Sequence, residues 1–318
     1  MGKSFVHTLE VINYVADQQK GIKIPLGYIL EAINLRLTGT LTISGGAASG
    51  TVVAEGPATL VKSIDLIADG AVLLKRYPMT VVYRANQFWK GTAPERTQLT
   101  TGDEGAEDFI QDIEIMFKQP LALDPESTLL DSRRYEDISL FITWGNTGNL
   151  ITGGDRTLAL TNVKVTPMLK FTDEPSDELF SIFKEYVIEK EITVTSADVP
   201  IDLNIGNVFR AIFFEVMAAL TPANNVINNI SLVSDTTIYH RLKMGWAQLQ
   251  ADNEVDYSLE AVPTGYVLDN LMPSGDLADA LDTEDFSDLK LHFDVTKQAG
   301  TNKIFTLFSE IIPASAII

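Results

Sequence analysis

Apolar and polar residues alternate along most of this 318-residue chain. Alternation with a period of two, rich in Val, Ile, Thr and Phe, is typical of strands that bury one face. It is clearest in NLRLTGTLTIS (34–44), SIDLIADGAVLL (63–74), DISLFITW (137–144), LALTNVKVTPMLKF (158–171) and KIFTLFSEII (303–312). After the first of these, the small-residue connector GGAASG (45–50) suits a hairpin loop that needs positive φ angles. The pattern predicts an all-β protein with antiparallel sheets.

One stretch near the middle of the chain departs from this pattern. In PSDELFSIFKEYVIEK (175–190), apolar side chains recur at helical spacing, at Leu179, Phe180, Phe183, Tyr186 and Val187. Ser176 precedes them as a candidate N-cap. We therefore expect a short amphipathic helix that connects two domains.

Three blocks of the sequence occur twice. LDSRRYEDISL (130–140) matches LDTEDFSDLKL (281–291) at a constant offset of 151 residues, and IDLIAD (64–69) matches ISLVSD (230–235) at an offset of 166. Further upstream, IPLGYILEAINL (24–35) resembles IDLNIGNVFRAIFF (201–214), with Ala32 over Ala211 and Ile33 over Ile212 at an offset of 179. The offsets fall in chain order, as expected if the second copy has shorter surface loops. The repeat predicts a tandem duplication of one β domain.

The duplication narrows the fold class. Some eight strand-like segments in each copy, joined by long connections, are typical of a jelly roll. An immunoglobulin pair would have shorter domains and usually a disulfide, whereas this chain has no cysteine; a propeller would need four or more shorter repeats. We predict two tandem eight-stranded jelly-roll β-sandwiches (a double jelly roll) joined by a short helical connector. The first, with an N-terminal arm, takes residues 1–173, the connector 174–190 and the second jelly roll 191–318.

Composition excludes several function classes. The chain has 24 Lys and Arg against 43 Asp and Glu, a net charge of −19, so direct nucleic-acid binding is disfavoured. The absence of cysteine excludes disulfides, thiolate metal sites and cysteine nucleophiles. The N-terminus lacks the pattern of a secretory signal. The most apolar stretch, VFRAIFFEVMAALTP (208–222), is interrupted by Arg210 and Glu215 and is too short to span a bilayer, so we expect a buried strand there.

Candidate catalytic chemistry is sparse. The three histidines, His7, His240 and His292, are not near a G-x-S-x-G motif, and no nucleotide-binding or zinc-hydrolase motif is present. We therefore expect no catalytic, cofactor-binding or metal-binding residues and no enzyme activity. A dense acidic run contains Asp276, Asp279, Asp282, Glu284, Asp285 and Asp288. It favours a solvated loop, because its spacing does not match a calcium-binding loop, although Ca²⁺ binding stays open at this point.

A carbohydrate-binding alternative depends on the tryptophans. Trp89, Trp144 and Trp246 could stack on sugars in a lectin-like or glycan-active β-sandwich protein such as a viral spike. Packing in a core or a subunit interface is the better interpretation, because large aromatic side chains are mostly buried.

The repeated strands carry a resemblance to a known family. The opening HTLEVINYVADQQKGIKIPLGYILEAINLRLTGTLTISGG (7–46), LVKSIDLIADGAVLLKRY (60–77) and the paired blocks at 130–140 and 281–291 resemble the double jelly-roll major capsid proteins of tailless icosahedral viruses, including bacteriophages with an internal membrane. The resemblance implies a structural virion protein, made in the host cytoplasm, whose homotrimers form pseudo-hexagonal capsomers. It also implies neighbouring capsomers and minor capsid or vertex proteins as partners, and no cofactor.

The first eight residues precede the first matched strand. With Val11 over Ile192 and Ile24 over Ile201 as approximate guides, the residues before His7 have no counterpart except the connector. We therefore expect an unpaired N-terminal arm. Lys3 and the α-amino group make the arm cationic, which predicts weak contact with an anionic internal membrane.

Overall fold

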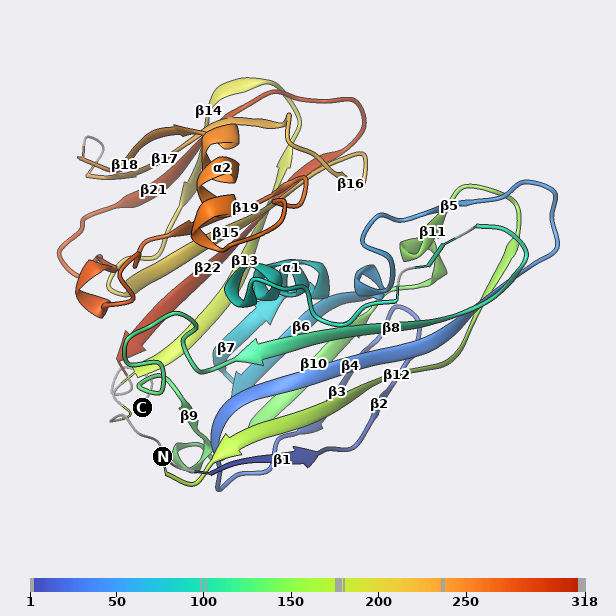
Figure 1. Ribbon diagram of the computed structural model, residues 1–318, viewed down its shortest axis with the longest axis horizontal. Coiled ribbons are helices and arrows are strands. Elements are labelled where there is room, and N and C mark those ends of the chain that lie inside the picture. Colours follow the sequence, from blue (N-terminus) through green and yellow to red (C-terminus); the bar gives the residue numbers. More distant parts are fainter. Residues whose placement is uncertain are drawn as a thin grey trace.

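The computed structural model describes residues 3–97, 99–100, 102–174, 179, 181–235 and 238–313, without the side chains of 238–242. Its strands form two tandem jelly rolls, each built from two packed sheets (Figure 1), so the predicted fold class is confirmed. Both sandwiches bury the apolar face of their long central strands between their sheets, as the period-two pattern requires.

The first jelly roll takes its strands from the N-terminal half. One sheet has the order β1 (Ser4–Thr8), β12 (Thr157–Thr172), β4 (Ile29–Ser44) and β8 (Gly105–Met116); β2 (Ile12–Asn13) also pairs with β12, and β9 (Leu130–Asp131) with β4. The facing sheet has the order β7 (Val72–Tyr77), β6 (Val61–Ala68), β10 (Ile138–Trp144) and β3 (Gln19–Lys23). Short strands β5 (Thr51–Val52) and β11 (Ile151–Thr152) pair at one end, and helix α1 (Met79–Lys90) follows β7.

The second jelly roll repeats this plan. Its first sheet contains β13 (Ser181–Ile192), β22 (Asn302–Pro313), β15 (Val208–Ala218) and β19 (Tyr266–Asn270), with short β16 (Thr221–Pro222) and β20 (Leu281–Asp282) also on β15. The facing sheet has the order β14 (Ser196–Asp202), β21 (Leu289–Val295), β17 (Ile227–Ser234) and β18 (Ile238–Gly245). Helix α2 (Trp246–Asp256) follows β18, as α1 follows β7.

The predicted helical connector is wrong over its described part. Residues 181–190 belong to β13, which pairs with β22 along its full length, while Ser176 and Phe180 lie outside the described residues. The apolar spacing was compatible with a helix, but hydrogen-bonding partners on both edges of this segment impose the extended conformation. The second jelly roll therefore begins with β13 and not at residue 191.

The predicted free N-terminal arm is also wrong. Residues 4–8 form β1, which pairs antiparallel with β12 from Ser4 opposite Thr172 to Thr8 opposite Met168. The backbone N–H of Lys3 donates to the Asp173 carboxylate at 3.1 Å. β1 occupies in the first jelly roll the place that β13 occupies in the second, beside the last strand of the domain.

Strand register confirms the internal repeat. Leu66 pairs with Leu140 in the first jelly roll, and their counterparts Leu232 and Leu291 pair in the second. β4 begins at Ile29 and β15 at Val208, which reproduces the offset of 179. One guide position was misplaced, because the Ile24 N–H donates to Ile138 as the Leu203 N–H donates to Leu289. Ile24 therefore corresponds to Leu203 and not to Ile201.

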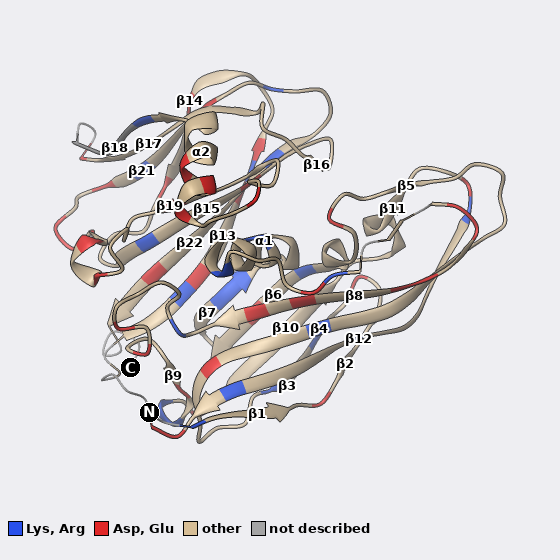
Figure 2. Cartoon of the chain, viewed as in Figure 1, with Lys and Arg blue, Asp and Glu red and all other residues tan. Residues whose placement is uncertain are grey.

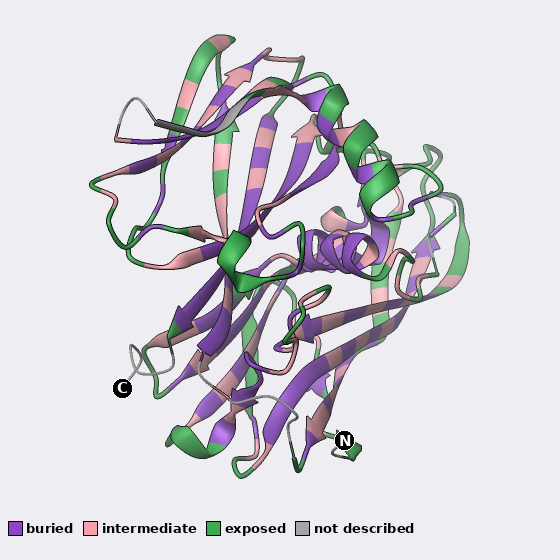
Figure 3. Cartoon of the chain, turned by 60° about the vertical axis from the view of Figure 1, so that its left-hand side comes forward, coloured by how far each residue is buried: buried purple, intermediate pink, exposed green. Residues whose placement is uncertain are grey.

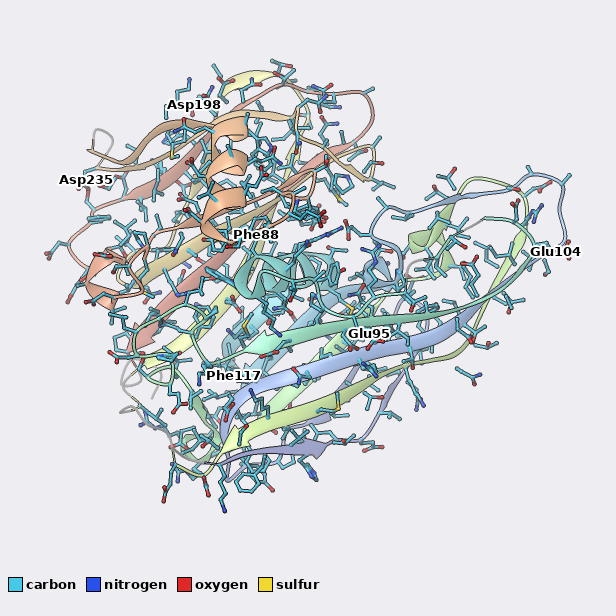
Figure 4. All side chains as sticks on the ribbon, viewed as in Figure 1. Phe88, Glu95, Glu104, Phe117, Asp198 and Asp235 are labelled. Carbon is cyan, nitrogen blue, oxygen red and sulfur yellow. The ribbon has the colours of Figure 1, made fainter. Side chains whose placement is uncertain are left out.

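Polar contacts at the ends of the strands repeat as well. In the β6–β7 turn, Asp69 has a φ of 49° and accepts hydrogen bonds from the backbone of Glu136 and Asp137. In the β17–β18 turn, Asp235 has a φ of 50° and accepts from the Ser287 backbone (Figure 4). These two links are equivalent, because each carboxylate accepts from a backbone N–H just before a strand. The repeat therefore extends to contacts between the connecting loops.

Buried residues form two apolar clusters, one in each sandwich, and the first cluster extends across the junction to Ala211, Phe213 and Leu307 of the second jelly roll (Figure 3). Leu140 and Leu291 are 0% and 1% exposed, each inside its own sandwich, so their predicted equivalence is confirmed. Trp89, Trp144 and Trp246 are also buried. This agrees with the packing interpretation and leaves no exposed tryptophan for sugar stacking.

Candidate functional site

One sheet of each jelly roll is joined to a sheet of the other by strand pairing. β7, at the edge of a sheet of the first jelly roll, pairs in parallel with β13 of the second, with Lys75 opposite Glu185 and Arg76 opposite Tyr186. The result is a ten-stranded sheet that runs through both domains. Backbone pairing restricts relative rotation of the jelly rolls more strongly than a linker would, so this junction is the site that sets the shape of the molecule.

A buried ion pair crosses the junction. Lys75 Nζ lies 2.8 Å from Glu185 Oε2, with the two side chains 0% and 8% exposed, and the charged segments of β7 and β13 are visible side by side in Figure 2. Ser309 Oγ donates to the other carboxylate oxygen at 3.2 Å. The Lys75 ammonium is also 4.0 Å from the centre of the Phe183 ring. Burial lowers the pKa of Lys75, and Glu185 opposes that shift by stabilising the charged amine.

Arg210 is a second buried cation at the junction. It is 0% exposed, its guanidinium lies 4.4 Å from the centre of the Trp89 ring, and it donates to the Pro120 carbonyl. Burial lowers the pKa of Arg210 to about 10, while the nearby Glu185 raises it. Arg210 belongs to β15, whereas Trp89 and Pro120 belong to the first jelly roll. The side chain therefore ties the two domains together through cation–π and hydrogen-bonding contacts.

Two buried carboxylates complete the junction. Glu215, also on β15, accepts hydrogen bonds from Tyr266 Oη at 3.0 Å and from Thr80 Oγ1, on α1, at 3.1 Å. Burial, and next the negative charge of Glu55, raise the pKa of Glu215 to about 7. Glu55 is itself paired with two arginines, since Arg84 and Arg96 approach its carboxylate at 2.8 and 3.0 Å.

The sequence identified the segment that carries these residues but not their role. Arg210 and Glu215 were recognised as charges that interrupt an apolar stretch, and the predicted buried strand is confirmed as β15. Their partners Trp89, Thr80 and Glu55 are more than 100 residues away in the chain. The only signal in the sequence was the charges themselves, because a charge inside a buried strand requires a partner.

The histidines and the acidic run do not converge on one site. His7 is exposed on β1, His292 Nδ1 lies 2.6 Å from the Asp198 carboxylate (labelled in Figure 4), and the His240 side chain is outside the described residues. The residues of the acidic run lie in the loops and short elements before β21, where Asp276 and Asp282 accept from nearby backbone N–H groups. Over the described part of the chain, no group of three or more His, Asp or Glu side chains is arranged to hold a metal ion.

No described helix is both long and apolar enough to cross a membrane. Several large apolar side chains are exposed on strands and loops. Phe5 and Val6 are 41% and 67% exposed on β1, and Leu121 and Leu123 are 58% and 67% exposed in the loop after β8.

The fold and its junction define the class of this chain as a double jelly-roll protein, in which two eight-stranded sandwiches are joined through one sheet that they share. Among solved structures it is similar to the STIV MCP, with a TM-score of 0.78, 18% identity and 98% of both chains covered. It is also similar to the major capsid protein P2 from Bacteriophage PM2, with a TM-score of 0.64, 15% identity and coverage of 98% of this chain and 99% of that one. The Faustovirus major capsid protein matches with a TM-score of 0.56, 7% identity and coverage of 99% and 91%.

No protein-family model and no curated protein sequence matches this chain. At these identities the structural matches establish the fold, and they cover both jelly rolls and their arrangement from end to end.

Proposed function

We propose that this protein is a major capsid protein that forms the shell of an icosahedral virus. The observation that carries the proposal is the rigid tandem arrangement, in which two similar jelly rolls are fused through β7 and β13. Capsid proteins of three viruses match the fold of this chain over at least 91% of their own chains. A capsid subunit must keep its shape when it contacts neighbouring subunits, and a shared sheet with buried ion pairs supplies that rigidity.

The proposed assembly unit is a homotrimer. Three chains with two similar jelly rolls each would place six similar domains around one axis, which suits a six-sided lattice position. Symmetric closure of this kind is usual for homo-oligomers and would cover sheet edges that stay open in the single chain. The proposed role is structural and non-enzymatic. The protein would be synthesised in the host cytoplasm and would reside in the virion.

Further partners are proposed from the resemblance alone. They are neighbouring capsomers and minor capsid or vertex proteins, with no direct contact to the genome because the chain carries a net charge of −19. Contact with an internal membrane has less support than the sequence suggested, because β1 is a paired strand and not a free arm.

Two measurements test the proposal. Light scattering of the purified protein should give three chains of 34.9 kDa each, and negative-stain micrographs should show six-sided particles or closed shells. A monomer at micromolar concentration and physiological salt, with no assemblies on the grid at higher concentration, would count decisively against a shell protein. Saturable binding to a glycan array by such a monomer would instead favour the carbohydrate-binding alternative.

A further inference from the structure

We propose that the open edge of β1 pairs in parallel with the open edge of β18 from a second copy of this chain, and so repeats between chains the β7–β13 junction found within one chain. This inference rests on the proposed trimer and adds to it a specific pair of strands and a register.

The repeat makes the two pairs of strands equivalent. β1 and β13 each lie beside the last strand of their domain, with Val6 opposite Lys170 and Glu185 opposite Ser309. Leu169 pairs with Ile33, and Phe308 pairs with Ile212, the repeat counterpart of Ile33. Lys170 and Ser309 follow Leu169 and Phe308 directly, so they are equivalent as well. Val6 therefore takes the place of Glu185.

The other strand is assigned in the same way. Lys75 of β7 pairs with Leu66, and Arg241 of β18 pairs with Leu232, the repeat counterpart of Leu66. Because Lys75 lies opposite Glu185 at the junction within the chain, the repeat places Val6 opposite Arg241 of a second copy. The ion pair itself is not repeated, so the new interface would use backbone hydrogen bonds and apolar contact.

Exposure shows that the edge of β1 lacks a partner. Glu185 is 6% exposed where β7 covers β13, whereas its counterpart Val6 is 67% exposed and the adjacent Phe5 is 41% exposed. The β1 sequence SFVHT contains neither the Lys nor the Pro that commonly protects an edge strand from pairing. Within the described residues, β1 is the last strand at one end of its sheet and β18 the last strand at one end of another.

The two open edges lie too far apart to meet within one chain. In Figure 1, β1 runs along the lower border of the molecule and β18 lies at the upper left, in the outer sheet of the second jelly roll. Pairing between them must therefore be head to tail between copies, which forms either a closed ring or an open filament. In a ring of three chains, junctions within chains and between chains would alternate around the axis.

A second copy is the occupant because the chain itself already contains this pairing. A strand of another protein could pair with one of these edges by backbone hydrogen bonds, but the other edge would stay open. A second copy satisfies both edges at once, since each chain offers one β1 edge and one β18 edge.

The absence of cysteine allows a direct test by disulfide trapping. Paired residues on neighbouring strands lie within the Cα separation that a disulfide requires. The full-length chain carrying V6C and R241C should, after mild oxidation, run on non-reducing gels as species of one, two and three chains. An equal mixture of the V6C and R241C single variants should stop at two chains.

A second pair protects the test against a misfolded variant. Met244 is the repeat counterpart of Tyr77, because it pairs with Ile230 as Tyr77 pairs with Ile64. Thr8 lies two residues after Val6, as Tyr77 lies two residues after Lys75, so T8C with M244C should give the same ladder. The matched control is V6C with V255C, because Val255 is 78% exposed on α2 and belongs to neither edge. We expect at least a tenfold excess of linked chains over this control.

Light scattering on the reduced samples separates the two levels of the proposal. A trimer that gives no more linkage than the control with either cysteine pair would overturn the strand pairing and leave the shell function standing. A monomer that gives no linkage would contradict both.

Discussion

Removing the negative charge from the junction ion pair should destabilise the whole protein. At the observed 2.8 Å, Lys75 and Glu185 attract each other by about 6 kcal/mol at an effective dielectric constant of 20. Desolvation of both groups offsets much of that attraction. In Glu185→Gln the penalty remains without the compensation, because the buried Lys75 loses the carboxylate that opposes the lowering of its pKa, and Arg210 loses its nearby anion. We expect the free energy of unfolding to fall by about 3–5 kcal/mol.

The assay is urea denaturation at pH 7 and at one protein concentration, since subunit association would shift the apparent stability. Tryptophan fluorescence reports on both cores and on the junction, because Trp144 and Trp246 are buried in the two jelly rolls and Trp89 packs against Arg210. The double variant K75M/E185M removes both charges and should recover most of the loss, with a coupling energy of at least about 2 kcal/mol.

Two results would refute this reasoning. One is a loss below about 1 kcal/mol in Glu185→Gln, the range of an exposed ion pair. The other is a double variant as unstable as the sum of the single variants Lys75→Met and Glu185→Met, because additivity would mean that the two charges do not interact.

Three further outcomes are expected. Glu215→Gln should flatten the dependence of stability on pH. In the wild type, folding raises the pKa of Glu215 to about 7, so the protonated carboxyl stabilises the fold fully below the unfolded pKa near 4.5. This contribution of about 3 kcal/mol is lost as the pH rises through 7. Parallel stability curves for variant and wild type in calorimetry from about pH 4.5 to 8 would contradict this. Leu140→Ala and Leu291→Ala should each cost about 2–5 kcal/mol in urea denaturation, and loss from only one of them would mean that the repeated strands do not support equivalent cores. Gly39→Ala should cost about 1–3 kcal/mol, because its Cβ would lie 2.5 Å from Val163 Cγ2 and 2.7 Å from the Phe109 ring; an unchanged melting temperature would show that this packing can relax.

The alternation of apolar residues and the repeat were enough to establish the class of fold. Strand formation depends mainly on which face of a segment is buried, and burial appears in the sequence as a period of two. The repeat was detectable because equivalent core positions need similar side chains, so that Leu66 and Leu140 recur as Leu232 and Leu291. Loop lengths differ between the copies, which the falling offsets had already indicated.

The first strand of each jelly roll was the segment that the sequence misjudged. β13 has an apolar pattern compatible with a helix, and β1 is too short and too exposed to show a period at all. Both become strands because neighbouring strands supply hydrogen-bonding partners, and those neighbours come from distant parts of the chain.

What the sequence by itself determined is therefore the two sandwiches, the positions of their main strands and the buried nature of the stretch that contains Arg210 and Glu215. Only the tertiary structure decided how the sandwiches are joined, which partners those charges find, and which edges remain open. The reason is that core burial is a property of single residues along a strand, whereas strand pairing and charge compensation belong to pairs such as Lys75 and Glu185, which are 110 residues apart in the chain.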